Sequence, residues 1–279
     1  MRTFLTRGTL RTVLTYTLLL ALAFIMLLPF IWMLSASLKL DKDVFRFPIE
    51  WIPKDPQWSN YKTIWTRIPF LTFFANTFKL TVIITFLQVA TSSFAAYAFA
   101  KLDFKGKNFL FLAYLGSIAV PWQVYMIPQF ILMRELGLVD THLSLILLQA
   151  FTAFGVFLMR QFFISVPDEI LDAARIDGLS EYGIFLRIML PMSKPALATL
   201  TIFSAVFVWN DFMGPLIYLN EPGKYTVSLG LKMFVDQEGL ANYGGMIAMS
   251  LVALLPVLAF FLAFQRYLID GMATSGLKG

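Results

Sequence analysis

Residues 167–178 read PDEILDAARIDG, a charged and helix-prone segment in a chain that is otherwise mostly apolar. Asp168 and Glu169 fall in the first turn of the expected helix, where the helix dipole favours negative charge. Gly178 follows the last turn, at a position that often requires a positive φ and therefore a glycine. The pattern predicts a short helix over residues 168–177.

A second helical run is expected directly after this helix. Ser180 is a suitable N-cap, and the run should continue to Met189. We expect Pro191 to end it, because proline lacks the backbone N–H that a helix interior uses. A helix as short as 168–177 is marginal by itself in water. It therefore needs a supporting surface, and its apolar flanks indicate that it protrudes from a membrane.

The composition defines the broad class of the chain. Of its 279 residues, 58% are hydrophobic and 14% are charged, whereas soluble domains are about 25% charged. This balance predicts an all-α, polytopic membrane protein. The absence of cysteine and the single histidine, His142, leave no basis for a disulfide, a thiolate nucleophile or a metal site. The net charge of +5 fits basic residues beside a membrane better than nucleic-acid binding.

Six apolar segments are long enough to cross the hydrocarbon layer. We expect one transmembrane domain over residues 1–279, with a charged loop at 164–195. Lys and Arg are more frequent on the side of the N-terminus and of this loop, which predicts that both termini are cytoplasmic. Two prolines, Pro121 and Pro128, interrupt the third segment. The expected spans are 13–34, 73–100, 109–133, 143–163, 196–219 and 246–268.

The charged loop resembles the "EAA" loop of ATP-binding-cassette importer permeases. The family pattern has E-A-A, a glycine four residues after the last alanine, and I-x-L-P ten residues beyond the glycine. The same spacing occurs here, with Asp172 in place of the usual glutamate, so that the charge is kept on a shorter side chain. The C-terminal residues 265–279 also resemble the sugar permeases of the maltose-transporter branch. The matching residues are Asp172, Ala173, Ala174, Gly178, Ile188, Leu190 and Pro191.

The resemblance implies that residues 168–177 form a coupling helix in a groove of an ATP-binding subunit. Asp172 would pair there with a basic residue, Ala173 and Ala174 would pack against the groove, and Gly178 would permit a sharp exit. The implied partners are a homologous second permease subunit, two ATP-binding subunits, an extracytoplasmic solute-binding protein, and a sugar or oligosaccharide, in a bacterial-type inner membrane. The expected coupling residues are Glu169, Asp172, Ala173, Ala174, Asp177, Gly178 and Pro191.

A second candidate site lies in the fifth span, where Trp209, Asn210, Asp211 and Phe212 follow one another. An Asn–Asp pair inside a membrane is costly unless it is paired or hydrated. Aromatic rings suit the apolar face of a sugar and the polar pair suits its hydroxyls, so these residues could line a translocation pathway. Trp-Asn followed by an aromatic residue also resembles the sugar permeases. The alternative is that the polar pair makes helix–helix hydrogen bonds.

The energy source is expected to lie on another chain. No G-x-x-x-x-G-K-[ST] motif occurs, so ATP and Mg²⁺ should bind to the partner subunit, and this chain should hold no cofactor. Intramembrane carboxylates are sparse, which argues against a stand-alone, ion-coupled secondary transporter, although the two prolines leave that alternative open. A membrane-embedded enzyme is a third class, and too few reactive side chains are present for it. No catalytic residue is therefore expected.

Overall fold

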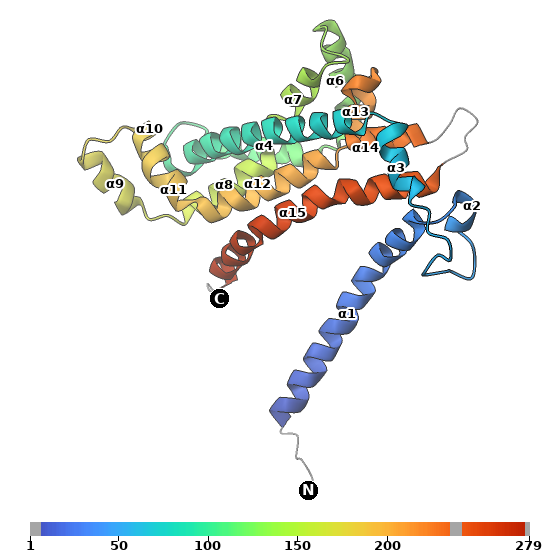
Figure 1. The fold of residues 1–279 in the computed structure, drawn as a ribbon. Coiled ribbons are helices and arrows are strands. Elements are labelled where there is room, and N and C mark those ends of the chain that lie inside the picture. The colour runs from blue at the N-terminus through green and yellow to red at the C-terminus, as the bar shows by residue number, and fades with distance from the viewer. Residues whose placement is uncertain (1–6, 235–241, 277–279) are drawn as a thin grey trace. The chain divides into compact units, whose positions relative to one another are not determined.

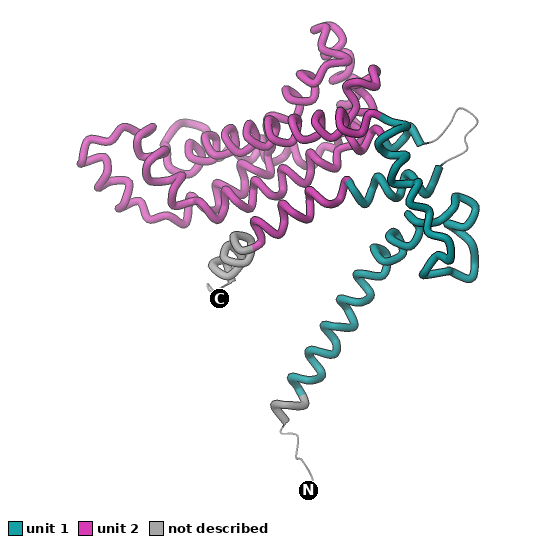
Figure 2. Tube along the Cα trace, viewed as in Figure 1, with its two compact units in different colours: residues 1–68, 231–252 teal, residues 69–230, 253–279 magenta. Residues whose placement is uncertain are grey.

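A computed structural model describes residues 7–234 and 242–276 of the chain. Every regular element in these two ranges is helical, which confirms the all-α class (Figure 1). Residues 235–241, which lie between the expected fifth and sixth spans, and the end of the C-terminal tail lie outside the described residues. Figure 2 shows the division of the chain into two compact units, 1–68 with 231–252 and 69–230 with 253–279. The assignment of residues 1–279 to one permease domain stays a prediction.

The first unit contains the expected first span. This span is α1 (Arg7–Ser37), and it is followed by α2 (Asp41–Val44) and α3 (Ser59–Thr66). The apolar side chains of α1 are largely exposed, as expected for a helix that faces lipid. The side-chain amide of Asn60 donates to the carbonyl oxygens of Ser37 and Lys39, both at 2.9 Å, and so fixes α3 to the end of α1. The unit also holds η4 (Leu231–Phe234) and the start of α15 (Tyr243–Gly276).

The second unit is organised around α4 (Phe70–Lys101), which packs beside α8 (Ala153–Ile164) and α12 (Lys194–Trp209) (Figure 1). Polar side chains on α4 donate hydrogen bonds to the backbone of the neighbouring span. That span is interrupted between α7 (His142–Gln149) and α8. Gln88 Nε2 donates to the carbonyl oxygen of Gln149 at 2.7 Å, and Thr91 Oγ1 donates to that of Ala150 at 2.9 Å. These bonds replace helix hydrogen bonds that the interruption removes.

The spans are less regular than the sequence predicts. Within residues 7–234 and 242–276, four helical stretches are long and apolar enough to cross a membrane, or up to six if each of two bent pairs counts as one span. The expected third span is one such pair, in which Lys107–Ala119 (α5, Lys107–Gly116, and η1, Ser117–Ala119) meets α6 (Trp122–Glu135) at 98°. Pro121 lies at this bend as the N-cap of α6, whereas Pro128 lies inside α6 without ending it. The expectation that both prolines interrupt this span is therefore wrong for Pro128.

The loop at 164–195 forms a cluster of short helices at the Lys101 end of α4. It comprises α9 (Asp168–Ile176), α10 (Glu181–Ile184), a π-helical segment at Phe185–Met189 and α11 (Leu190–Met192). At the opposite end of α4 lie α13 (Met213–Tyr218), η3 (Pro222–Lys224) and α14 (Val227–Gly230) (Figure 1). The fold thus separates the two candidate sites: residues 168–178 lie at one end of α4, and residues 209–212 lie toward the other.

Candidate functional site

The helix α9 forms where the sequence predicts it. It runs from Asp168 to Ile176, with Asp168 and Glu169 in its first turn and Arg175 in its last. Gly178 has a φ of +83°, and its N–H donates to the carbonyl oxygen of Arg175 at 3.0 Å. A β-carbon at Gly178 would meet no atom within 4 Å, so the backbone conformation alone requires glycine here. The predicted turn out of the helix is therefore confirmed.

The two faces of α9 have different environments. Leu171 is 0% exposed and Ala174 is 6% exposed, and both lie in the unit's own hydrophobic cluster. Ala173 is exposed, and Ile176 is 86% exposed. The i, i+3 spacing from Leu171 turns Ala174 toward the core, so this alanine is largely covered within the chain and its expected contact with a partner stays a prediction. Ala173 is the alanine that another subunit can reach.

The acidic residues of α9 also have contacts within the chain. Asp172 Oδ1 accepts from Arg175 Nη1 at 2.7 Å, so the carboxylate expected to bind a partner already has a basic neighbour. Arg175 Nε donates to Glu181 Oε1 at 2.8 Å, and this bond raises the pKa of Arg175. The same guanidinium, followed by the Tyr97 hydroxyl, lowers the pKa of the Glu181 carboxyl below its ordinary value. Glu169 and Asp177 are exposed.

The helical run after Ser180 departs from its expected end. Ser180 caps α10 as predicted, accepting from the Gly183 N–H at 3.3 Å. The run continues through Pro191 to Met192, and the 79° bend falls between Met192 and Lys194. The five residues before α11 are π-helical, and such a turn relaxes the i→i−4 pattern that proline disrupts. Pro191 is exposed and does not end the run, which corrects the prediction.

The second candidate site is an interruption between α12 and α13, and the structure gives its residues separate roles. Trp209 is buried, and its Nε1 donates to the carbonyl oxygen of Ala253 at 3.1 Å. Asn210 is exposed and donates to the carbonyl oxygen of Val206 at 2.8 Å, within its own helix. Asp211 accepts from Gln149 and from the Gly214 N–H. Phe212 is exposed.

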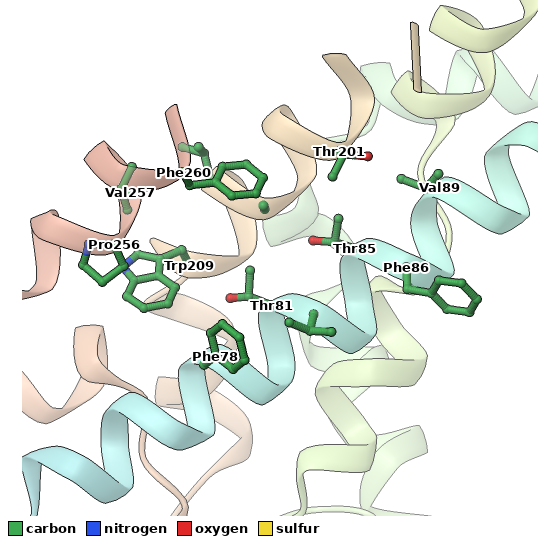
Figure 3. Close-up of a pocket in the computed structure, with 13 residues that line it drawn as sticks. Phe78, Thr81, Thr85, Phe86, Val89, Thr201, Trp209, Pro256, Val257 and Phe260 are labelled. Atoms are coloured by element: carbon green, nitrogen blue, oxygen red, sulfur yellow. The ribbon is translucent and has the colours of Figure 1, made fainter. Parts of the chain in front are cut away.

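Trp209 lines a cavity of about 380 Å³ within the second unit (Figure 3). The walls come from α4, α12 and the part of α15 after residue 252, and they are almost entirely apolar. Two threonines on α4, Thr81 and Thr85, lie on its wall, and their buried hydroxyls have no hydrogen-bond partner among the described residues. An unpaired buried hydroxyl is costly, so it marks a position where water or a solute can bind.

Sequence reasoning missed several residues that shape these sites. Thr77, Thr81 and Thr85 recur at intervals of four, a spacing that places them on one face of a helix and could have indicated the cavity wall. Tyr97, Gln149 and Glu181 carry no such signal, because each is defined by a partner 62 or 84 residues away. The residues concerned are Thr81, Thr85, Tyr97, Gln149 and Glu181.

Comparison with known proteins identifies the class. The family model described as "Binding-protein-dependent transport system inner membrane component" matches residues 88–274, and the chain belongs to this family. It is thus an inner-membrane permease subunit of a binding-protein-dependent ATP-binding-cassette importer, and its relatives are permease components of transporters. This assignment does not favour the secondary-transporter alternative.

Individual relatives extend the likeness over nearly the whole chain. The arabinooligosaccharides transport system permease protein AraQ of Halalkalibacterium halodurans is 36% identical over 261 residues, 92% of this chain and 93% of the relative. The melibiose/raffinose/stachyose import permease protein MelC of Bacillus subtilis is 32% identical over 256 residues, 90% of this chain and 91% of the relative.

The sn-glycerol-3-phosphate transport system permease protein UgpE of Pectobacterium atrosepticum is 30% identical over 242 residues, 84% of this chain and 86% of the relative. Among solved structures, a bacterial ABC transporter involved in the import of the acidic polysaccharide alginate contains a chain that is 26% identical. That chain superposes with a TM-score of 0.81, covering 96% of this chain and 100% of that one. The likeness therefore extends to the fold as well as to the sequence.

Proposed function

We propose that this chain forms half of the translocation pathway of an importer for a neutral sugar or oligosaccharide. Movements of the ATP-binding subunits during ATP hydrolysis would be transmitted to this chain through α9. The assembly would contain a homologous second permease, two ATP-binding subunits that hold ATP and Mg²⁺, and an extracytoplasmic solute-binding protein. Both termini and α9 would lie on the cytoplasmic side of the inner membrane.

The two-faced environment of α9 carries the coupling proposal. The helix is charged, so it lies outside the hydrocarbon layer, yet Ile176 is 86% exposed. Ile170 and Ala173 are also exposed and precede Ile176 at intervals of three, so the helix presents a row of apolar side chains, and contiguous exposed apolar surface marks protein–protein contacts. Ala173 lies on the accessible part of the same helix and permits close approach of another backbone. These features support docking of α9 into a groove of an ATP-binding subunit.

The cavity supports a neutral solute over an anionic one. None of the thirteen residues that line it is charged, and aromatic rings of Phe78, Trp209 and Phe260 stand on its wall (Figure 3). Recognition of a phosphate or carboxylate commonly uses Arg or Lys, whereas aromatic faces and hydroxyl groups suit a sugar. The arabinooligosaccharide and melibiose/raffinose/stachyose systems of the relatives also support a sugar.

The test is uptake by the full complex in proteoliposomes, with its binding protein outside and ATP inside. Labelled neutral oligosaccharides are expected to accumulate only when both ATP and the binding protein are present. Uptake driven by an ion gradient without ATP would contradict the coupling proposal. Import of sn-glycerol-3-phosphate in preference to the oligosaccharides would contradict the solute class while leaving the coupling intact.

A further inference from the structure

A chain of polar side chains joins α9 to the second span. Glu181, the first residue of α10, uses both of its carboxylate oxygens: Oε1 accepts from Arg175 Nε at 2.8 Å, and Oε2 accepts from the Tyr97 hydroxyl at 2.6 Å. Arg175 also donates to Asp172 at 2.7 Å. The network therefore runs from the middle of α9, through α10, to the last turns of α4. Charge-assisted bonds of this kind are short and strongly directional.

A second connection holds the beginning of α9 to the same helix. Lys101 Nζ donates to Asp168 Oδ1 at 2.5 Å and to the carbonyl oxygen of Val166 at 2.6 Å. The Lys101 side chain is 4% exposed, so its position is fixed by the surrounding packing. Tyr97 and Lys101 are four residues apart and share one face of α4. One face of one helix thus holds α9 near both of its ends.

The apolar contacts beneath α9 complete this attachment. Leu171 and Ala174 lie in the same cluster as Tyr97, Phe163 and Phe185. The centroid of the Tyr97 ring lies 5.3 Å from the centroid of the Phe185 ring. It lies 6.3 Å from the centroid of the Phe163 ring, and these two rings meet edge to face. Tyr97 therefore packs through its ring and donates through its hydroxyl. Because these two functions use different atoms, removing the hydroxyl alone tests the polar connection without disturbing the packing.

We propose that Glu181 and Tyr97 are positioning residues that make α9 and the end of α4 move as one body. This inference rests on the proposed docking of α9 to an ATP-binding subunit. A displacement of α9 would pass through Glu181 to Tyr97 and along α4 to the cavity wall at Thr81 and Thr85. Closely packed helices transmit such displacements because they have few alternative arrangements. Without the bond between Glu181 and Tyr97, α9 would remain docked and would still be held by Lys101 and the apolar cluster, but its displacement would pass to α4 less completely.

The experiment compares Tyr97→Phe, Glu181→Gln and the double variant in the full complex in proteoliposomes. The measured quantities are co-purification of the ATP-binding subunits, the rate of solute uptake, and the number of ATP molecules hydrolysed per solute imported. The ATP-binding subunits are expected to co-purify with every variant. Uptake is expected to fall about fivefold to tenfold in each single variant, with ATP hydrolysis falling less, so that the ratio of ATP to solute rises.

Two further comparisons separate coupling from general damage. The rate of solute uptake in the double variant should fall no further than in the worse single variant, because both substitutions break the same connection between Tyr97 and Glu181. Asp103→Asn is the matched control, since it removes an exposed ion pair to Lys107 at 3.0 Å near the same end of α4 without touching α9. It should leave uptake and the ATP ratio unchanged.

The outcomes separate this inference from the proposed function. An unchanged ATP-to-solute ratio in Tyr97→Phe, or additive losses in the double variant, would overturn the proposed connection while leaving docking intact. An equal loss in Asp103→Asn would likewise overturn it. Failure of the unmodified chain to bind ATP-binding subunits would overturn the proposed function itself.

Discussion

Gln149 Nε2 donates to Asp211 Oδ2 at 2.8 Å, and this bond joins two interrupted spans. Gln149 ends α7, and Asp211 lies in the break between α12 and α13. The other oxygen of Asp211 accepts from the Gly214 N–H at 3.1 Å, at the start of α13. Interruptions in a membrane span are tolerated where side chains satisfy the freed backbone groups. Asp211 therefore bonds across the break and to a neighbouring helix, and its expected place on a translocation pathway stays a prediction.

Replacing Asp211 by alanine should destabilise the protein by about 1–3 kcal/mol, because it leaves the partly buried Gln149 amide and the Gly214 N–H without their partner. The measurement is thermal unfolding in detergent. Asn210→Ala is the neighbouring control and should change stability much less, since Asn210 is exposed and bonds only within its own helix. Equal effects of the two substitutions would contradict the assigned roles.

Replacing Gly178 by alanine should weaken coupling through the backbone. The φ of +83° costs an L-residue about 1–2 kcal/mol, although a methyl group there meets no neighbouring atom. We expect lower transport and less stimulation of ATP hydrolysis by the loaded binding protein. Gly183→Ala is the control in the same loop, because Gly183 lies in α10 and a β-carbon there meets only ordinary contacts, the nearest at 3.5 Å. Normal coupling in Gly178→Ala would contradict the prediction.

The two faces of α9 should respond differently to substitution. Ile176→Ser should reduce binding of the ATP-binding subunit while leaving the melting temperature unchanged, because Ile176 is exposed within this chain. Leu171→Ala should instead lower stability by about 2–5 kcal/mol, since it creates a cavity in a packed cluster. Co-purification and thermal unfolding distinguish the two results. A loss of stability in Ile176→Ser would show that this side chain supports the fold itself.

Asp140 should make stability depend on pH. Its carboxylate accepts from Lys224 Nζ at 2.8 Å and from the N–H groups of Asn220 and Glu221. These bonds lower the pKa of Asp140 from 3.8 to about 2. A lowered pKa in the folded state contributes stability that is full above the unfolded value and is lost as the pH falls through the folded value.

The variant that tests this dependence is Asp140→Asn, which tolerates the positive φ of 59° at this position. Its melting temperature should lie below that of the unmodified chain at pH 7, and the difference should narrow from pH 5 to pH 3. Glu221→Gln, which removes the more exposed partner of Lys224, should have a smaller effect. A difference that does not vary with pH would rule out ionisation of Asp140 as the cause.

Local patterns predicted those parts of the site that depend on neighbouring residues. The start of α9, its exit at Gly178 and the cap at Ser180 all follow from side chains within a few positions of one another. The end of the second run was misplaced, because the π-helical turn that accommodates Pro191 belongs to the packing of the whole loop. The bend at Pro121 and the continuous helix at Pro128 likewise depend on neighbouring helices. A proline in a membrane helix can either interrupt the helix or lie inside it, according to whether neighbouring groups satisfy the freed backbone atoms.

The sequence by itself determined that this chain is a helical membrane permease with a short charged helix in one loop. Apolar length is a property of one continuous segment, charge placement and turn residues act over one or two turns of chain, and a long spaced motif adds the family. Tertiary structure decided which face of that helix is free, and it brought Glu181 to Tyr97 and Asp211 to Gln149. These pairs are 84 and 62 residues apart. Contacts of that separation depend on how whole helices pack, and local sequence patterns do not record that packing.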